Sequence, residues 1–98
     1  MNMKQIINKG TLIRRNPEQL FSTIDGEVVM LSVPNEEYYN LNIMGSHIWK
    51  KLEVPMTLGA LVTNLCEEFK VEEQLCLEET KVFIEGLMEK NIVQLGNG

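Results

Sequence analysis

The stretch that decides the fold reads Tyr38-Tyr39-Asn40-Leu41-Asn42-Ile43-Met44-Gly45-Ser46-His47-Ile48-Trp49. Its aromatic opening is typical of a β-strand, whereas Met44, Ile48 and Leu52 repeat every four positions, as on one face of a helix. Only Asn42 separates the two patterns, and its side chain can accept from a free backbone N–H of the first helical turn. A short strand therefore runs directly into a helix, which we expect to end near Leu52 because a proline follows at position 55.

Two strands are expected before this junction. Asp25-Gly26 is a strong hairpin signal, because a type I′ turn needs positive φ at both of its central positions. Pro34-Asn35 then ends the second strand. The expected strands cover residues 19–24, 27–33 and 37–41 and form an antiparallel meander. A further short strand is expected around Thr11–Ile13.

Two more helices follow in the sequence. Thr57 is placed to cap the second helix, and the apolar residues of 58–69 follow the i, i+3, i+4, i+7 rule. The third is expected over about 73–90, with Asn91 as a C-terminal cap residue. Three antiparallel strands followed by three helices, the last two in helix-turn-helix order, predict an α+β domain of the winged helix-turn-helix type.

The expected third helix has a wider apolar face than packing on a core requires. At 100° per residue the apolar residues form an arc of about 140°. One fringe of this arc, formed by Cys76 and Phe83 beside Glu79, could therefore line something other than the domain's own interior. Trp49, in contrast, is expected in the core, where aromatic residues at helical spacing usually pack.

Length and charge limit the function classes. A chain of 98 residues has room for one domain. Its net charge of −5 opposes nucleic-acid binding, because phosphate contacts require clustered Lys or Arg, and a basic partner fits better. Neither a signal peptide nor a run of about 18 apolar residues is present, so we expect no membrane association and a cytoplasmic location.

Residues that carry chemistry are sparse. Cys66 and Cys76 are expected as buried, reduced thiols, since they lie in helical stretches without metal-ligand spacing. His47 has no Cys, His or Asp residue at metal-ligand spacing, so it does not predict a metal site. Ser46 and His47 are adjacent on a helix, where their side chains point in different directions, so they do not predict a nucleophile and its base. The sequence contains no glycine-rich phosphate loop, HExxH or paired CxxC motif, and we predict no cofactor and no catalysis.

The junction quoted first, Tyr-Tyr-x-Leu-Asn followed by x-x-Gly-x-x-Ile-Trp, resembles the PqqD-like leader-peptide recognition domains. Residues 57–62 are similar to the family's Thr-x-x-x-Leu-Val, and residues 79–87 to its Asp-Val-x-x-Phe-Leu-x-x-Leu. Glu79 replaces Asp and Thr80 replaces Val in the second motif. The domain is expected over residues 16–95, after an N-terminal extension or short strand at 1–15.

The resemblance implies a peptide-binding adaptor, most like the free-standing recognition protein of lasso-peptide biosynthesis. A precursor leader peptide would add beside the third strand and lie in a groove toward the third helix. A leader-cleaving cysteine protease and an ATP-dependent cyclase would be further partners. The expected leader contacts are Glu37, Tyr38, Tyr39, Asn40, Leu41, Cys76, Glu79, Thr80 and Phe83. Successive strand residues face opposite sides, so one tyrosine points inward with Leu41, but the sequence leaves open which.

Three alternatives stay open at the level of sequence. The domain could serve a radical-SAM peptide maturase, as the resemblance to the pyrroloquinoline quinone member implies. It could instead be a winged-helix transcription regulator or an anti-repressor, although the glutamates of residues 72–89 weigh against DNA. An exposed edge strand also invites strand exchange between two copies, which would give a homodimer.

Overall fold

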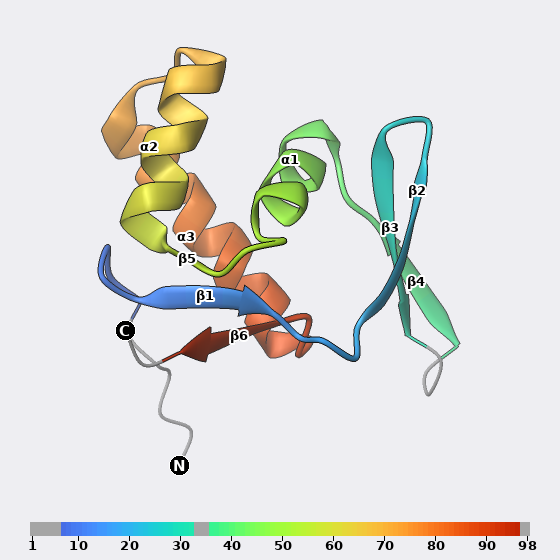
Figure 1. The fold of residues 1–98 in the computed structure, drawn as a ribbon. Helices are drawn as coiled ribbons and strands as arrows, with labels where there is room; N and C mark the ends of the chain where they lie inside the picture. Colours follow the sequence, from blue (N-terminus) through green and yellow to red (C-terminus); the bar gives the residue numbers. More distant parts are fainter. Residues whose placement is uncertain (1–6, 33–35, 97–98) are drawn as a thin grey trace.

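The computed structural model describes residues 7–32 and 36–96 (Figure 1). The elements in chain order are β1 (Leu12–Arg15), β2 (Leu20–Ile24), β3 (Glu27–Ser32), β4 (Glu37–Asn40), α1 (Ile43–Lys51), β5 (Met56–Thr57), α2 (Leu58–Phe69), α3 (Glu73–Glu89) and β6 (Val93–Gly96). The predicted α+β class, with a three-stranded antiparallel sheet followed by three helices, is confirmed. The predicted strand end at Val33 and the break at Pro34-Asn35 lie outside the described residues.

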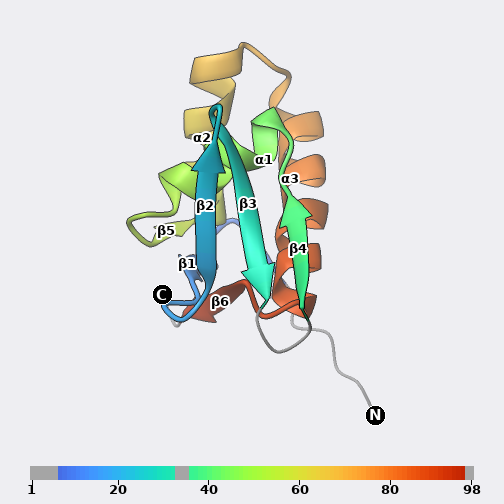
Figure 2. The same cartoon turned by 90° about the vertical axis from the view of Figure 1, so that its right-hand side faces the viewer.

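The antiparallel meander has the strand order β2-β3-β4 (Figure 2). Asp25 and Gly26 have φ values of 53° and 83°, which confirms the predicted turn with positive φ at both positions. Cross-strand register aligns Leu20 with Leu31 and Leu31 with Tyr38. Because side chains alternate along each strand, these residues share the outer face of the sheet and their neighbours face the helices.

A second sheet, in the order β5-β1-β6, was missed by sequence reasoning, which expected only a short strand at 11–13. It lies across the base of the helices in Figure 1. Ile13 of β1 is fully buried, and Arg15 donates two hydrogen bonds to the Trp49 carbonyl oxygen, at 3.0 and 2.5 Å. This strand therefore shares the core of the helices, while the expected domain limits at residues 15 and 16 stay a prediction.

The helix starts agree with the sequence. Asn42 Oδ1 accepts from the Gly45 N–H at 2.7 Å, and Thr57 Oγ1 accepts from the Ala60 N–H at 3.1 Å, so both predicted N-caps are confirmed. Each cap occupies one backbone donor that the first turn would otherwise leave free. The direct passage from β4 into α1 thus depends on Asn42.

The end of α3 is a Schellman-type turn. Asn91 has a φ of 58° and lies one residue past the cap residue, Lys90. Its N–H donates to the Met88 carbonyl oxygen, and the Ile92 N–H donates to that of Leu87, both at 2.9 Å. This turn directs the chain from α3 into β6.

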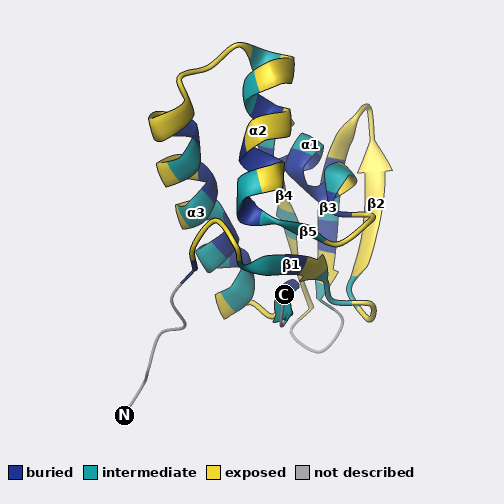
Figure 3. Ribbon diagram, turned by 60° about the vertical axis from the view of Figure 1, so that its left-hand side comes forward, coloured by how far each residue is buried: buried dark blue, intermediate teal, exposed yellow. Residues whose placement is uncertain are grey.

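The core lies where the inner faces of the helices meet both sheets, coloured dark blue in Figure 3. Trp49 is 1% exposed, which confirms its predicted place in the core. Ser46, also buried, accepts from the Val28 N–H at 2.9 Å and donates to the Leu41 carbonyl oxygen at 3.3 Å. It fastens α1 to both β3 and the end of β4, so it holds the strand–helix junction in place.

Candidate functional site

The site begins at the open edge of β4, which among the described residues pairs only with β3. The Leu41 N–H donates to the Val28 carbonyl oxygen at 2.8 Å. In an antiparallel ladder, residue pairs that exchange backbone hydrogen bonds alternate with pairs that do not. Leu41 belongs to a hydrogen-bonded pair, so Tyr39, two residues earlier, also directs its N–H and C=O groups toward β3. The N–H and C=O groups of Tyr38 and Asn40 therefore point away from the sheet. Figure 2 shows this edge of β4 beside α3.

The two tyrosines face opposite sides, and the structure decides between them. Tyr39 is half-buried and packs toward the core, with Leu41 buried on the same side. Tyr38 is 71% exposed on the outer face of the sheet, and Asn40, two residues further along β4, is exposed on the same face. The Tyr39 hydroxyl donates to a carboxylate oxygen of Glu37 at 2.7 Å. Tyr39 is therefore the tyrosine that borders the space between β4 and α3.

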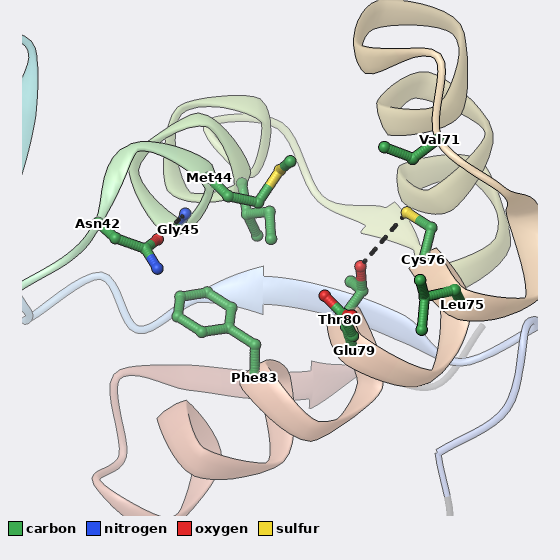
Figure 4. A pocket seen from close by; sticks show the side chains of 10 residues that line it. Asn42, Met44, Gly45, Val71, Leu75, Cys76, Glu79, Thr80 and Phe83 are labelled. Atoms are coloured by element: carbon green, nitrogen blue, oxygen red, sulfur yellow. Dashed lines mark hydrogen bonds between the residues drawn. The ribbon is translucent and has the colours of Figure 1, made fainter.

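The first of three adjoining hollows, the upper cleft, lies between α1 and the first half of α3 (Figure 4). Its volume is about 250 Å³. Most of its lining is apolar, and Thr80 lies within 3.8 Å of the Cys76 sulfur at its inner side. The lining residues are Asn42, Met44, Gly45, Ile48, Val71, Leu75, Cys76, Glu79, Thr80 and Phe83.

Phe83 separates the upper cleft from the next one. A Cβ atom at Gly45 would lie 2.9 Å from Cζ of the Phe83 ring and 3.2 Å from the Asn42 side-chain oxygen. Figure 4 shows the ring pointing toward α1 at this position. Glycine at position 45 therefore lets the ring approach the helix backbone, and the ring forms a wall shared by two clefts.

The lower cleft, of about 260 Å³, lies between β4 and the second half of α3. It is lined by Tyr39, Leu41, Val82, Phe83, Gly86, Leu87, Lys90 and Ile92. The end cleft, of about 310 Å³, adjoins it and is lined by Gln19, Ser32, Tyr39, Glu89, Lys90, Asn91 and Ile92. Neighbouring clefts share Phe83 on one side and Tyr39, Lys90 and Ile92 on the other. The three clefts thus lie in a row along α3, with Phe83 between the first two, and this row is called the groove below.

The groove carries few charges. The Lys90 ammonium lies 4.4 Å from the centre of the Tyr39 ring, a cation–π contact between α3 and β4. Glu79 is exposed at the rim of the upper cleft. Behind that cleft, burial raises the pKa of the Cys66 thiol, and the neighbouring Cys76 thiol acts in the same direction. Cys66 therefore stays a neutral thiol at neutral pH.

Most of the residues predicted as leader contacts lie at the groove. Tyr39, Leu41, Cys76, Glu79, Thr80 and Phe83 line the groove, and Glu37 reaches it through its bond to Tyr39. The side chains of Tyr38 and Asn40 face away from it, so only their backbones border the open edge. Their assignment as leader contacts, like that of the other residues, stays a prediction.

Several groove residues were missed. Val82, Gly86 and Lys90 follow Glu79 and Phe83 at helical spacing. They could therefore have been predicted from the sequence by extending the helix face that Glu79 and Phe83 define. The residues of α1 that line the upper cleft could not be predicted from the sequence, because their position depends on the angle at which α1 and α3 pack. Both cysteines are free as expected, but Cys66 is only half-buried rather than buried.

Other kinds of site find no support in the part of the chain that the structure describes. No group of three or more His, Cys, Asp or Glu side chains there is placed to hold a metal ion. Within the same residues, none of the helices has both the length and the apolar character needed to span a membrane. His47 packs edge-to-face on Phe69, with ring centres 5.0 Å apart, and lies near Glu68.

Comparison with known proteins adds two findings. The family model described as coenzyme PQQ synthesis protein D (PqqD) matches residues 27–93, which include both β4 and α3. Among solved structures, TbiB1 in complex with the TbiA(beta) leader peptide is similar, with 26% identity, a TM-score of 0.76, and coverage of 87% of this chain and 98% of that chain. No curated protein sequence matches significantly. Since the match spans most of the 98 residues, the chain belongs to the PqqD family.

Proposed function

We propose that this protein binds the leader of a ribosomally made precursor peptide by adding it as a strand beside β4. The observation that carries the proposal is the open edge of β4 bordering a groove along α3. An extended peptide there would complete the ladder at Tyr38 and Asn40 and place alternate side chains in the clefts. The similarity to TbiB1, whose structure contains a leader peptide, supports the same assignment.

The interactions available are sufficient for a moderate affinity. Four ladder hydrogen bonds, two at each outward-facing residue, contribute about 2 to 6 kcal/mol in total. Two apolar side chains buried in the upper and lower clefts contribute about 3 to 6 kcal/mol. These oppose an association cost of at least about 4 kcal/mol. The upper end of this range corresponds to a dissociation constant of about 1 μM.

We further propose that the protein has no catalytic role and delivers the leader-bound precursor to maturation enzymes. In a lasso-peptide pathway these would be a leader-cleaving cysteine protease and an ATP-dependent cyclase. Tethering by the leader would raise the concentration of the core peptide at their active sites. A radical-SAM maturase is the second candidate, favoured by the PqqD family match. Co-purification with the enzymes encoded beside this gene distinguishes the two pathways.

The direct test is a fluorescence anisotropy titration. The probe is a labelled synthetic leader of a candidate precursor peptide, found by searching the genes around this one, and a scrambled peptide of the same composition is the control. We expect saturable binding of the leader, with a dissociation constant between about 1 μM and tens of micromolar, and much weaker binding of the scrambled peptide. Equal binding of both peptides, or none, would refute the proposal.

A further inference from the structure

We propose that two charged side chains without an ion-pair partner among the described residues, Glu79 at the upper end of the groove and Lys90 at the lower end, select the charge pattern and direction of the peptide. The inference rests on the proposed function and names the class of peptide that the site prefers. Glu79 would pair with a basic side chain near the peptide's N-terminal end, and Lys90 with an acidic side chain near its C-terminal end.

Glu79 is the charge at the upper end. Its side chain lies at the rim of an otherwise largely apolar cleft, next to Thr80 and one helical turn after Leu75. Among the described residues its carboxylate forms neither an ion pair nor a hydrogen bond, whereas Glu72, Glu73 and Glu78, nearby in the sequence, all have partners. A cation bound beside the apolar wall would therefore meet an unoccupied carboxylate.

Lys90 is the charge at the lower end. It lines both the lower and the end clefts, and its ammonium is held over the Tyr39 ring. Within residues 7–32 and 36–96 it has no carboxylate partner, although Glu89 lines the same cleft. The Asn91 side chain also borders the end cleft and can donate to a carboxylate beside the ammonium, whereas the Gln19 amide already donates to the carbonyl oxygens of Leu20 and Leu31.

The direction of the peptide follows from the sheet. β4 runs from Glu37, at the lower end, toward Asn42, which lines the upper cleft. All pairs in this sheet are antiparallel, and an antiparallel guest strand would run from the upper cleft to the end cleft. The two charges lie eleven residues apart on α3, about 16 Å at the helical rise. An extended peptide spans that distance in about five residues.

A peptide-display selection tests the inference without knowledge of the natural leader. The probe is a library of random peptides about fifteen residues long, longer than the groove. The baits are the unchanged protein, the charge-swapped variant E79K/K90E, and the control E78K/K81E. Both variants keep the net charge, and Glu78 and Lys81 are absent from the cleft linings. Circular dichroism checks that each variant is folded.

The unchanged protein and the control should enrich peptides with Lys or Arg N-terminal to the apolar positions and Asp or Glu C-terminal to them. The charge-swapped variant should enrich the opposite order and bind a peptide of the first kind about tenfold less tightly, with a smaller difference at high salt. Identical selections by all three baits would overturn the charge pattern and leave the proposed function intact. Failure of the unchanged protein to enrich any peptide would overturn both.

Discussion

At the scale of residues, the groove depends on two glycines with different surroundings. Gly45→Ala places a methyl group against the Phe83 ring and should destabilise the fold by about 1 to 3 kcal/mol. Gly86→Ala meets no atom within 4 Å and should stabilise α3 by about 0.5 to 1 kcal/mol. Gly86 lines the lower cleft, so its added methyl group should still weaken peptide binding. Urea unfolding and peptide titration measure the two effects separately; equal stability of both variants would contradict the packing at Gly45.

Phe83 is the residue on which both apolar clefts depend. Phe83→Ala removes their shared wall, and we expect a loss of about 1.5 to 3 kcal/mol of binding free energy, or about 10- to 100-fold in affinity. Phe21→Ala is the matched control, because Phe21 is also partly exposed but packs on Trp49 outside the groove. Equal affinity of the two variants, both shown to be folded by thermal melting, would place the peptide elsewhere.

At the scale of elements, the open edge of β4 can be blocked without removing its pairing to β3. Asn40→Pro removes the backbone N–H of residue 40, which points away from β3 toward the open edge. We expect peptide affinity to fall about tenfold, because one ladder hydrogen bond is lost and the proline ring obstructs the incoming strand. Thr23→Pro makes the same change at the outward edge of β2, where we expect no effect on binding. A loss of binding only in the Thr23 variant would assign the peptide to the other edge of the sheet.

The elements predicted from sequence were those with local signals. The turn at Asp25-Gly26 and the caps Asn42 and Thr57 mark boundaries within a few residues of the elements they limit. β5 has only two residues, which is too short for a periodic pattern. β6 pairs with a strand about 80 positions earlier, so its place in a sheet cannot be predicted from neighbouring residues. Which tyrosine faces the groove depended on the register between β3 and β4, which is likewise a non-local property.

At the scale of the whole molecule, the charge of the protein was predicted from its composition and the groove from its resemblance to a family. The predicted acidic surface belongs to a chain with net charge −5, which attracts basic peptides at long range and does so less at high salt. The groove itself came from the family resemblance, because composition does not reveal that an edge strand and a distant helix face one another. The structure adds that the end cleft is lined by side chains of both charges, Lys90 and Glu89.

The central claim is that a peptide joins the sheet at the open edge of β4. Amide hydrogen exchange read by nuclear magnetic resonance tests it most directly, with and without a saturating concentration of a leader peptide that binds in the titration above. The claim predicts that the amides of Tyr38 and Asn40 become protected on binding, while that of Tyr39, already facing β3, changes little. Saturable binding that leaves both outward amides unprotected would contradict it.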